Sequence, residues 1–540
     1  MKDKVMKRNS FVMSSFWTTF IIVLSRILGF FYVIPFYAIV GDRGGALYAY
    51  ATIIYGLFAA VATAGIPFAI SNIVSEYQTL GYHNVKQRVL FLGKRFSLIL
   101  GVILYLFLLL LAPLFAKGIL GDLVGGNNIT DIIFVIRIIS IALLISPVLY
   151  VYRGYFEGHR YTFFSSLSKE IECIVNIFIV VFGSYFALRV FKITLPSVIG
   201  VSLFGTFIGV VIAYLYLIGK KVKNKKKFDE KIRNVNEPII TNKMILKKLF
   251  VYAVPFVLID IFKYLYGFVD LFTVIKTLVE VTGCSVLEAE TIIGNLTIWG
   301  FQFLVIFIFI SSETIKGVAP NLINSVVKKN KKYANKIISQ SLSVLLFVMV
   351  PITIGLSFLA EPIWMLFYGK SLYGPSILSY LVFVGLFMGL FFAGIYILKI
   401  LKEYKIIFVS LAIGLMLKVI LNTSLMVTFY KLGLPAYYGV ITSSLVAYFV
   451  PFVICLIALH GKYKVDYEDT LKEFLDILCG CMLMVIVLFM MKFIVPIVSV
   501  NRLVNLFIIF IYTLVGSVVY LIFMFKIRAV NNIFSDKVKN

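Results

Sequence analysis

Long apolar runs constrain the fold of this chain more than any other feature of its sequence. Fourteen runs, each of about the 20 residues that a helix needs to cross a bilayer, alternate with short polar or basic breaks. Apolar residues make up 61% of the 540 positions and charged residues 14%, whereas soluble domains average about 45–50% and about 25%. We therefore predict an all-α polytopic membrane protein with fourteen transmembrane helices. The runs begin near residues 12, 47, 91, 131, 167, 195, 249, 291, 341, 376, 406, 434, 475 and 503.

The placement of basic residues predicts the orientation of the chain. An even number of spans puts both termini on one side, and most of the 51 Lys and Arg residues fall in the termini and loops of that side. Positive loops stay cytoplasmic, so both termini are expected in the cytoplasm. The net charge of +26 then lies along a membrane surface, most densely at residues 220–248. We expect anionic membrane lipids, and not nucleic acid, as its partner.

Two stretches recur about 240 residues apart and predict an internal duplication. Residues 195–201 (LPSVIGV), at the start of span six, are matched by residues 434–440 (LPAYYGV) at the start of span twelve. Residues 111–113 in span three are echoed by residues 359–362, which we place in span nine. Because six spans are an even number, both copies insert in the same orientation, which implies a pseudo-two-fold axis along the membrane normal.

The duplication predicts a division of the chain into two lobes and two additional elements. The first six spans form an N-terminal lobe and the next six a C-terminal lobe, joined by a basic cytoplasmic linker. Two further helices and a cytoplasmic tail follow. The predicted boundaries are 1–219 for the N-terminal lobe, 220–248 for the linker, 249–460 for the C-terminal lobe, and 461–540 for spans thirteen and fourteen with the tail.

Four basic residues lie inside predicted spans, where a charge at mid-bilayer costs about 2.5–3.5 kcal/mol on insertion scales. They are Arg26, Arg137, Lys263 and Lys418. Each therefore needs an acidic partner, water or a function. Arg26, Lys263 and Lys418 lie near mid-depth, whereas Arg137 lies closer to the outer face.

The acidic residues inside spans suggest partners for two of these cations. Asp260 and Lys263 have the i,i+3 spacing of a local ion pair, although a functional role is equally open. Glu172 and Lys418 occupy equivalent positions in the two repeats. Two roles are open for them: a latch between the lobes, or contacts to a ligand. Arg26 has no acidic residue within four positions. We favour a water-filled, anion-attracting cavity around it over a core arginine bonded to backbone carbonyls.

Excess positive charge in a cavity between two repeated bundles is typical of an alternating-access carrier for an anionic substrate. Glu172, Asp260 and Asp270 would balance that charge or couple it to an ion. No zinc-protease, serine-hydrolase or dinucleotide-binding pattern occurs, so we expect no catalytic or metal-binding residues and no enzyme activity. Residues 369–371 (GKS) resemble the end of a phosphate-binding loop, but Trp364 replaces the required first glycine. We expect no cofactor, and a driving force from membrane potential or a monovalent cation.

Several short stretches resemble those of a known transporter family. Residues 25–30 (SRILGF), and residues 153–158 (RGYFEG) followed by Ser168 and Glu172, are similar to segments of the MurJ and SpoVB/YtgP-type lipid II flippases. These belong to the multidrug/oligosaccharidyl-lipid/polysaccharide (MOP) exporter superfamily. Further similar stretches are residues 64–67 (AGIP), 75–77 (SEY), 359–362 (LAEP) and 418–422 (KVILN).

The resemblance implies a flippase that moves a lipid-linked, diphosphate-bearing cell-wall precursor across the bacterial inner membrane. We expect the protein to be a monomer. The resemblance further implies that the last two helices form a groove for the lipid tail. Arg26 matches the first cavity arginine of the family, and we predict that it binds the diphosphate together with Lys263 and Lys418. Tyr32 and Val33 stand where the family has a second arginine and an aspartate.

The sequence leaves three alternatives to a lipid II-like substrate. The first is a flippase for another undecaprenyl-linked polysaccharide or for a teichoic-acid precursor. The second is a MATE-like drug or cation exporter, which would prefer an acidic cavity. The third is a polytopic glycosyl-transfer enzyme, which would need catalytic carboxylates or histidines on its outward loops.

Overall fold

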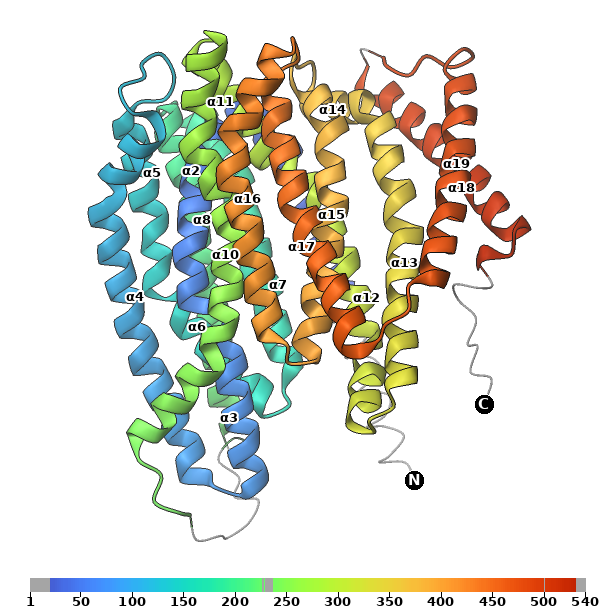
Figure 1. The fold of residues 1–540 in the computed structure, drawn as a ribbon. Coiled ribbons are helices and arrows are strands. Elements are labelled where there is room, and N and C mark those ends of the chain that lie inside the picture. The colour runs from blue at the N-terminus through green and yellow to red at the C-terminus, as the bar shows by residue number, and fades with distance from the viewer. Residues whose placement is uncertain (1–19, 226–227, 229–236, 500, 531–540) are drawn as a thin grey trace, which may run out of the picture. The chain divides into compact units, whose positions relative to one another are not determined.

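The computed structural model describes residues 20–225, 228, 237–499 and 501–530, and every regular element within these ranges is helical. The chain forms two compact units, Met1–Phe272 and Thr273–Asn540 (Figure 1). Much of the predicted basic linker, at 226–227 and 229–236, lies outside the described residues.

The first unit begins with a helix over residues 20–31, which a single turn residue separates from α2 (Val33–Thr63). Gly41 interrupts α2 with φ of 63° and ψ of −167°, a backbone conformation that glycine adopts readily. The helices that follow are α3 (Ile66–Leu80), α4 (His83–Leu120), α5 (Ile129–Ser140), α6 (Ser146–Gly158), α7 (Thr162–Phe178), α8 (Leu195–Lys223) and most of α10 (Asn242–Thr282). Two π-helical turns extend α7 as far as Val190.

The second unit continues with helices of 9 to 28 residues. Its C-terminal end is the hairpin of α18 and α19, which corresponds to the two additional predicted spans. The helices are α11 (Val286–Gly294), α12 (Phe301–Val327), α13 (Lys331–Phe358), α14 (Ala360–Tyr368), α15 (Gly374–Ile400), α16 (Tyr404–Lys431), α17 (Tyr437–Tyr463), α18 (Glu468–Met491) and α19 (Arg502–Lys526).

The described residues contain twelve helical segments that are long and apolar enough to cross a membrane. One of them, Phe20–Leu80, has 61 residues and would extend about 90 Å, so it holds two passes divided at Gly41. The 41-residue helix α10, with Asp260, Lys263 and Asp270 along it, supplies a further pass. The predicted fourteen-span, all-α membrane fold is confirmed.

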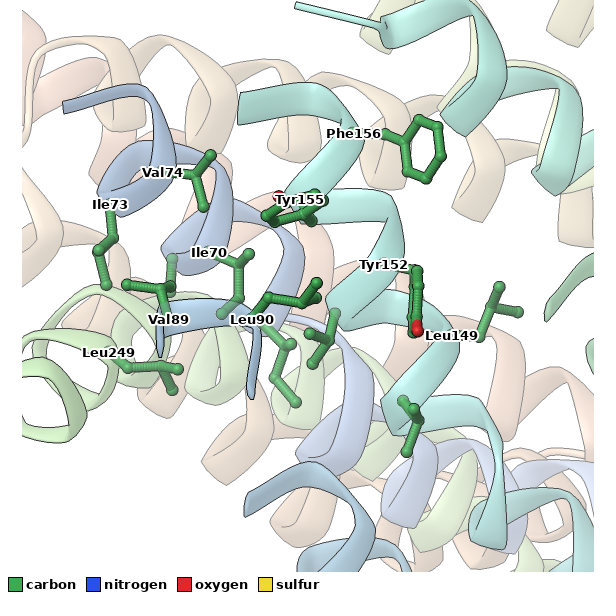
Figure 2. Packing of buried hydrophobic residues seen from close by; sticks show 14 of the residues in the cluster. Ile70, Ile73, Val74, Val89, Leu90, Leu149, Tyr152, Tyr155, Phe156 and Leu249 are labelled. Atoms are coloured by element: carbon green, nitrogen blue, oxygen red, sulfur yellow. The ribbon is translucent and has the colours of Figure 1, made fainter. Parts of the chain in front are cut away.

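Helix α6 shows how the sequence builds the first unit. Gly154 and Gly158 lie one turn apart, and a Cβ on them would come within 2.5 Å of the Pro67 carbonyl oxygen and 2.8 Å of the Ser71 carbonyl oxygen on α3. Only glycine allows this approach of two backbones. Around the contact, Ile70 and other apolar side chains of α3, α4, α6 and α10 form a buried core (Figure 2).

Most of α10 packs within the first unit. A Cβ on Gly65 would lie 2.2 Å from the Ala253 carbonyl oxygen, and the ring of Tyr264 fills the space beside Gly56. The two compact units therefore divide at Phe272, inside α10.

One predicted span differs from the structure. The stretch 359–362, which we placed in span nine, follows the end of α13 at Phe358 and opens the separate short helix α14. Its proposed counterpart, Pro113, lies inside the continuous helix α4. The two stretches are therefore similar in sequence but not in local structure.

Candidate functional site

Arg26 lies on the first described helix with its side chain exposed. Among the residues that the structure describes, it makes no ion pair and no hydrogen bond, and its charge acts on Cys173 of α7. The preceding residue, Ser25, is buried and donates a hydrogen bond to the carboxylate of Glu170 on α7. This polar contact holds the helix against α7, while the side chain of Arg26 stays exposed.

Lys263 forms the predicted local ion pair with Asp260 on α10, at 2.5 Å between Nζ and Oδ1. Both side chains are about one-third exposed (32% and 33%), so the pair is accessible from outside the protein core. The prediction of an i,i+3 ion pair is confirmed. Asp270 lies further along the same helix and is partly buried.

Glu172 pairs with Arg153, the first residue of the stretch 153–158. Arg153 lies on α6 and is only 1% exposed, with Nη2 at 2.6 Å from Glu172 Oε2 on α7. Its Nε donates to Ser168 Oγ at 2.8 Å, and its guanidinium lies over the Tyr150 ring. A buried charge is tolerated when it is paired and hydrogen-bonded in this way.

A second polar contact extends the same α6–α7 interface. Ser165 of α7 donates to Glu157 Oε1 of α6 at 2.7 Å, and Lys169 lies 3.5 Å from the same oxygen. Arg153 and Glu157 are four residues apart and share one face of α6, next to the face formed by its two glycines. The stretch 153–158 therefore packs against α3 on one side and binds α7 on the other. The ion pair between Arg153 and Glu172 was not predicted. The sequence does contain a signal for it, since Ser168 and Glu172 follow this stretch at a distance that matches the family.

Lys418 occupies a different environment from the solvated one that we predicted. Its side chain is 0% exposed, and Nζ contacts Asn422 Oδ1 at 3.1 Å, Ser443 Oγ at 3.1 Å and Ser444 Oγ at 2.6 Å. The Val440 carbonyl oxygen lies 3.3 Å away. The expectation of a water-filled surrounding is wrong for Lys418, because oxygens of α16 and α17 take the place of water around the ammonium group.

Glu172 and Lys418 are each satisfied within their own unit, in corresponding helical hairpins. In the first unit, a Cβ on Gly209 of α8 would lie 2.7 Å from the carbonyl oxygen of Glu172 on α7. In the second unit, Lys418 of α16 binds Ser444 of α17. The Lys418 side chain thus joins the fifth helix of its repeat to the sixth, whereas the Glu172 side chain joins the fifth helix of its repeat to the fourth.

The fold and these charges define a multi-pass membrane protein with the fold of the MOP superfamily transporters. Over 95% of the chain, the structure resembles that of "Lipid II flippase MurJ, inward closed conformation", covering 99% of that chain with a TM-score of 0.70 at 17% identity. It also resembles the inward-facing conformation of a multidrug resistance MATE family transporter of the MOP superfamily, with a TM-score of 0.60 at 13% identity, covering 82% of this chain and 96% of the other.

The chain belongs to the polysaccharide biosynthesis protein family, whose pattern matches residues 11–284. It is 32% identical over 423 residues to "Lipid II flippase MurJ" of Bacillus subtilis (strain 168), which covers 75% of this chain and 76% of that protein. These relationships confirm the resemblance drawn from residues 25–30 and 153–158.

Proposed function

We propose that this protein is a flippase that moves a lipid-linked, diphosphate-bearing cell-wall precursor, similar to lipid II, across the bacterial inner membrane by alternating access. The observation that carries the proposal is the 32% identity, over three quarters of the chain, to a protein named as a lipid II flippase. In this role the protein is a transporter and not an enzyme.

Arg26 is the residue that we assign first to the diphosphate. Its side chain is exposed, and within the described part of the chain its guanidinium donors have no protein acceptor. An arginine fork donates two hydrogen bonds at the geometry of a phosphate group. Lys263 is the second candidate because it is accessible, although Asp260 already neutralises part of its charge. We assign Lys418 to holding α16 against α17.

The hairpin of α18 and α19 is our candidate for contact with the polyprenyl tail. Large apolar side chains on both helices are exposed, including Met482 and Phe489 on α18 and Phe507 and Phe510 on α19. Such a surface is compatible with hydrocarbon, so the tail can stay in lipid while the headgroup crosses.

Energy for transport would come from the membrane potential or from a monovalent cation gradient, with both termini of the protein in the cytoplasm. Glu172 is already paired with Arg153, so a coupling role would require it to exchange that partner. Adding an ionophore to proteoliposomes should stop translocation of the lipid-linked precursor. Unchanged translocation would contradict this source of energy.

Complementation tests the function. Arg26→Ala should fail to rescue growth of a strain depleted of its own flippase, and Arg26→Lys should rescue it partly because it keeps the charge without the fork. The matched control is Arg137→Ala, which removes the other exposed arginine within a predicted span and should rescue fully. Immunoblots must show equal membrane levels, and full rescue by Arg26→Ala would remove Arg26 from the proposal.

Reconstituted vesicles distinguish the substrate and the class of protein. Lipid II should be translocated faster than a lipid-linked teichoic-acid or capsule precursor, and the recovered lipid should be chemically unchanged. Preference for another precursor would reassign the substrate. Conversion of the lipid into a product would indicate an enzyme.

A further inference from the structure

The second unit contains a surface cavity of about 540 Å³ that the proposed function does not use. It lies between α14, the loop that leads to α15 and the loop that leads to α19, and these elements meet at one end of the unit (Figure 1). Its lining includes Lys370 and Ser371, which belong to the GKS stretch that resembles part of a phosphate-binding loop. Glu361 and Ser499 complete the polar part of the lining.

Both loops around this cavity are held in place by hydrogen bonds. Asn505 of α19 is 0% exposed, accepts from the Ser499 backbone N–H and donates to its carbonyl oxygen, both at 2.7 Å. In the other loop, Ser371 Oγ accepts from the backbone N–H of Gly374 at 3.0 Å. Gly369 adopts a φ of 84°, which lets the chain turn at the cavity. These hydrogen bonds hold Ser371 and Ser499, two of the residues that line the cavity.

The electrostatics of the cavity favour an anion. Arg502 is the first residue of α19, whose first turn holds no acidic residue, although the helix dipole disfavours a cation there. Its Nη2 lies 3.5 Å from the place that a Cβ on Gly369 would occupy, so the guanidinium is beside the cavity loop. Lys370 and Arg502 thus add their charges to a positive helix end, which is a favourable arrangement for phosphate.

The three charged side chains at the cavity are available to a ligand. Within the described ranges, Lys370, Arg502 and Glu361 form no salt bridge with one another or with other residues. Their formal sum is one positive charge, which matches a headgroup with one negative charge. The exposed apolar residues Leu503 and Val504 follow directly on α19, where acyl chains would lie.

We propose that this cavity binds the headgroup of an anionic phospholipid of the phosphatidylglycerol type. The phosphate would accept hydrogen bonds from Lys370 and Arg502, and a glycerol hydroxyl would donate to Glu361. The acyl chains would run along the exposed face of α19. This inference concerns a bound membrane lipid and goes beyond the proposed transport function.

Native mass spectrometry of the purified protein with added phosphatidylglycerol tests the proposal. The double variant Lys370→Ala/Arg502→Ala should bind the most tightly retained lipid about tenfold more weakly, since it loses two charge-assisted hydrogen bonds. The matched control is Lys117→Ala/Lys431→Ala, which removes two charges at other helix ends and should bind normally. All of the changed side chains lie at the surface or at a helix end, and equal melting temperatures would verify that the variants fold.

Other outcomes would overturn the proposal. Equal retention by the double variant and by the unchanged protein would exclude this cavity, and equal losses in both double variants would indicate non-specific attraction to positive charge. Glu361→Gln should reduce the preference for phosphatidylglycerol over phosphatidic acid, because phosphatidic acid has no glycerol hydroxyl. An unchanged preference would contradict the contact between Glu361 and the hydroxyl. Inorganic phosphate serves as the headgroup probe. Stabilisation of the protein by phosphate as strong as that by phosphatidylglycerol would identify a site for free phosphate and contradict a lipid.

Discussion

Arg153 on α6 and Glu172 on α7 form a buried ion pair with 2.6 Å between nitrogen and oxygen. The arginine is 1% exposed and the glutamate 22%, so water cannot fully solvate either charge when its partner is removed. The pair joins two consecutive helices of the first unit at a place where no apolar contact could satisfy a guanidinium group.

Replacing Glu172 by Gln should therefore destabilise the protein strongly. Removing one partner of a buried pair costs about 3–5 kcal/mol, because it leaves the other charge uncompensated. We expect a clear drop in the melting temperature of the purified protein in detergent. The control is Glu313→Gln, which breaks a surface pair with Lys316 and should change little. Equal melting of the Glu172 variant and the unchanged protein would contradict a stabilising role for the pair.

Gly65→Ala should weaken the packing of α10 within the first unit. The new Cβ would lie 2.2 Å from the Ala253 carbonyl oxygen, and backbone must move to admit it. Overpacking of this kind costs about 1–3 kcal/mol. Faster hydrogen exchange of the backbone around Ala253 would measure the effect. Gly219→Ala is the control, because no heavy atom lies within 4 Å of its added Cβ, and similar exchange in the two variants would argue against the contact.

Lys418→Met should lower the stability of the protein more than it lowers transport. The methionine fits the length of the side chain but removes the charged donor from Asn422, Ser443 and Ser444, which keep only the neutral hydrogen bonds among themselves and with Val440. Hydrogen bonds to charged groups contribute about 1.5–3 kcal/mol. Melting curves should show this loss, whereas Lys431→Met, at the exposed end of α16, should melt normally. A variant with unchanged melting and abolished transport would instead support the predicted substrate contact.

Acid should destabilise the protein through His159, which lies in the turn between α6 and α7. Burial, together with Lys86 and Lys221, lowers the pKa of His159 from its usual 6.5 to about 4, despite a hydrogen bond to the Tyr155 carbonyl oxygen. The folded protein holds the neutral ring while the unfolded chain takes up a proton below pH 6.5. Stability therefore falls as the pH drops from about 6.5 to about 4, by up to about 3 kcal/mol.

Melting temperatures measured across this pH range test the role of His159. His159→Gln should flatten the pH dependence, since glutamine takes up no proton. His460→Gln, at the end of α17, should keep it. If the His159→Gln variant loses stability in acid as steeply as the unchanged protein, other groups cause the pH dependence.

The number and type of helices could be predicted from sequence because the bilayer sets one length and one polarity for every span. The Asp260–Lys263 pair could be predicted for a related reason, since both residues lie on one turn of one helix. Such local relationships need no knowledge of neighbouring helices.

The environments of Arg153 and Lys418 depend on other helices, so they could not be predicted from the helix on which each residue lies. Arg153 lies in the middle of α6, and its partners Ser168 and Glu172 come from α7. Lys418 lies in an apolar run, and only the approach of α17 supplies its oxygens. Hydropathy locates a span along the chain but does not show which of its faces meets a neighbour.

The two adjoining faces of α6 also restrict how this helix can change. Gly154 and Gly158 contact α3, while Arg153 and Glu157 bind α7. One residue inserted earlier in the helix would rotate all four by about 100°, bringing charged groups toward the tight glycine contact. Substitutions can therefore accumulate elsewhere on α6, but its length cannot vary, and insertions and deletions in related proteins should fall outside it.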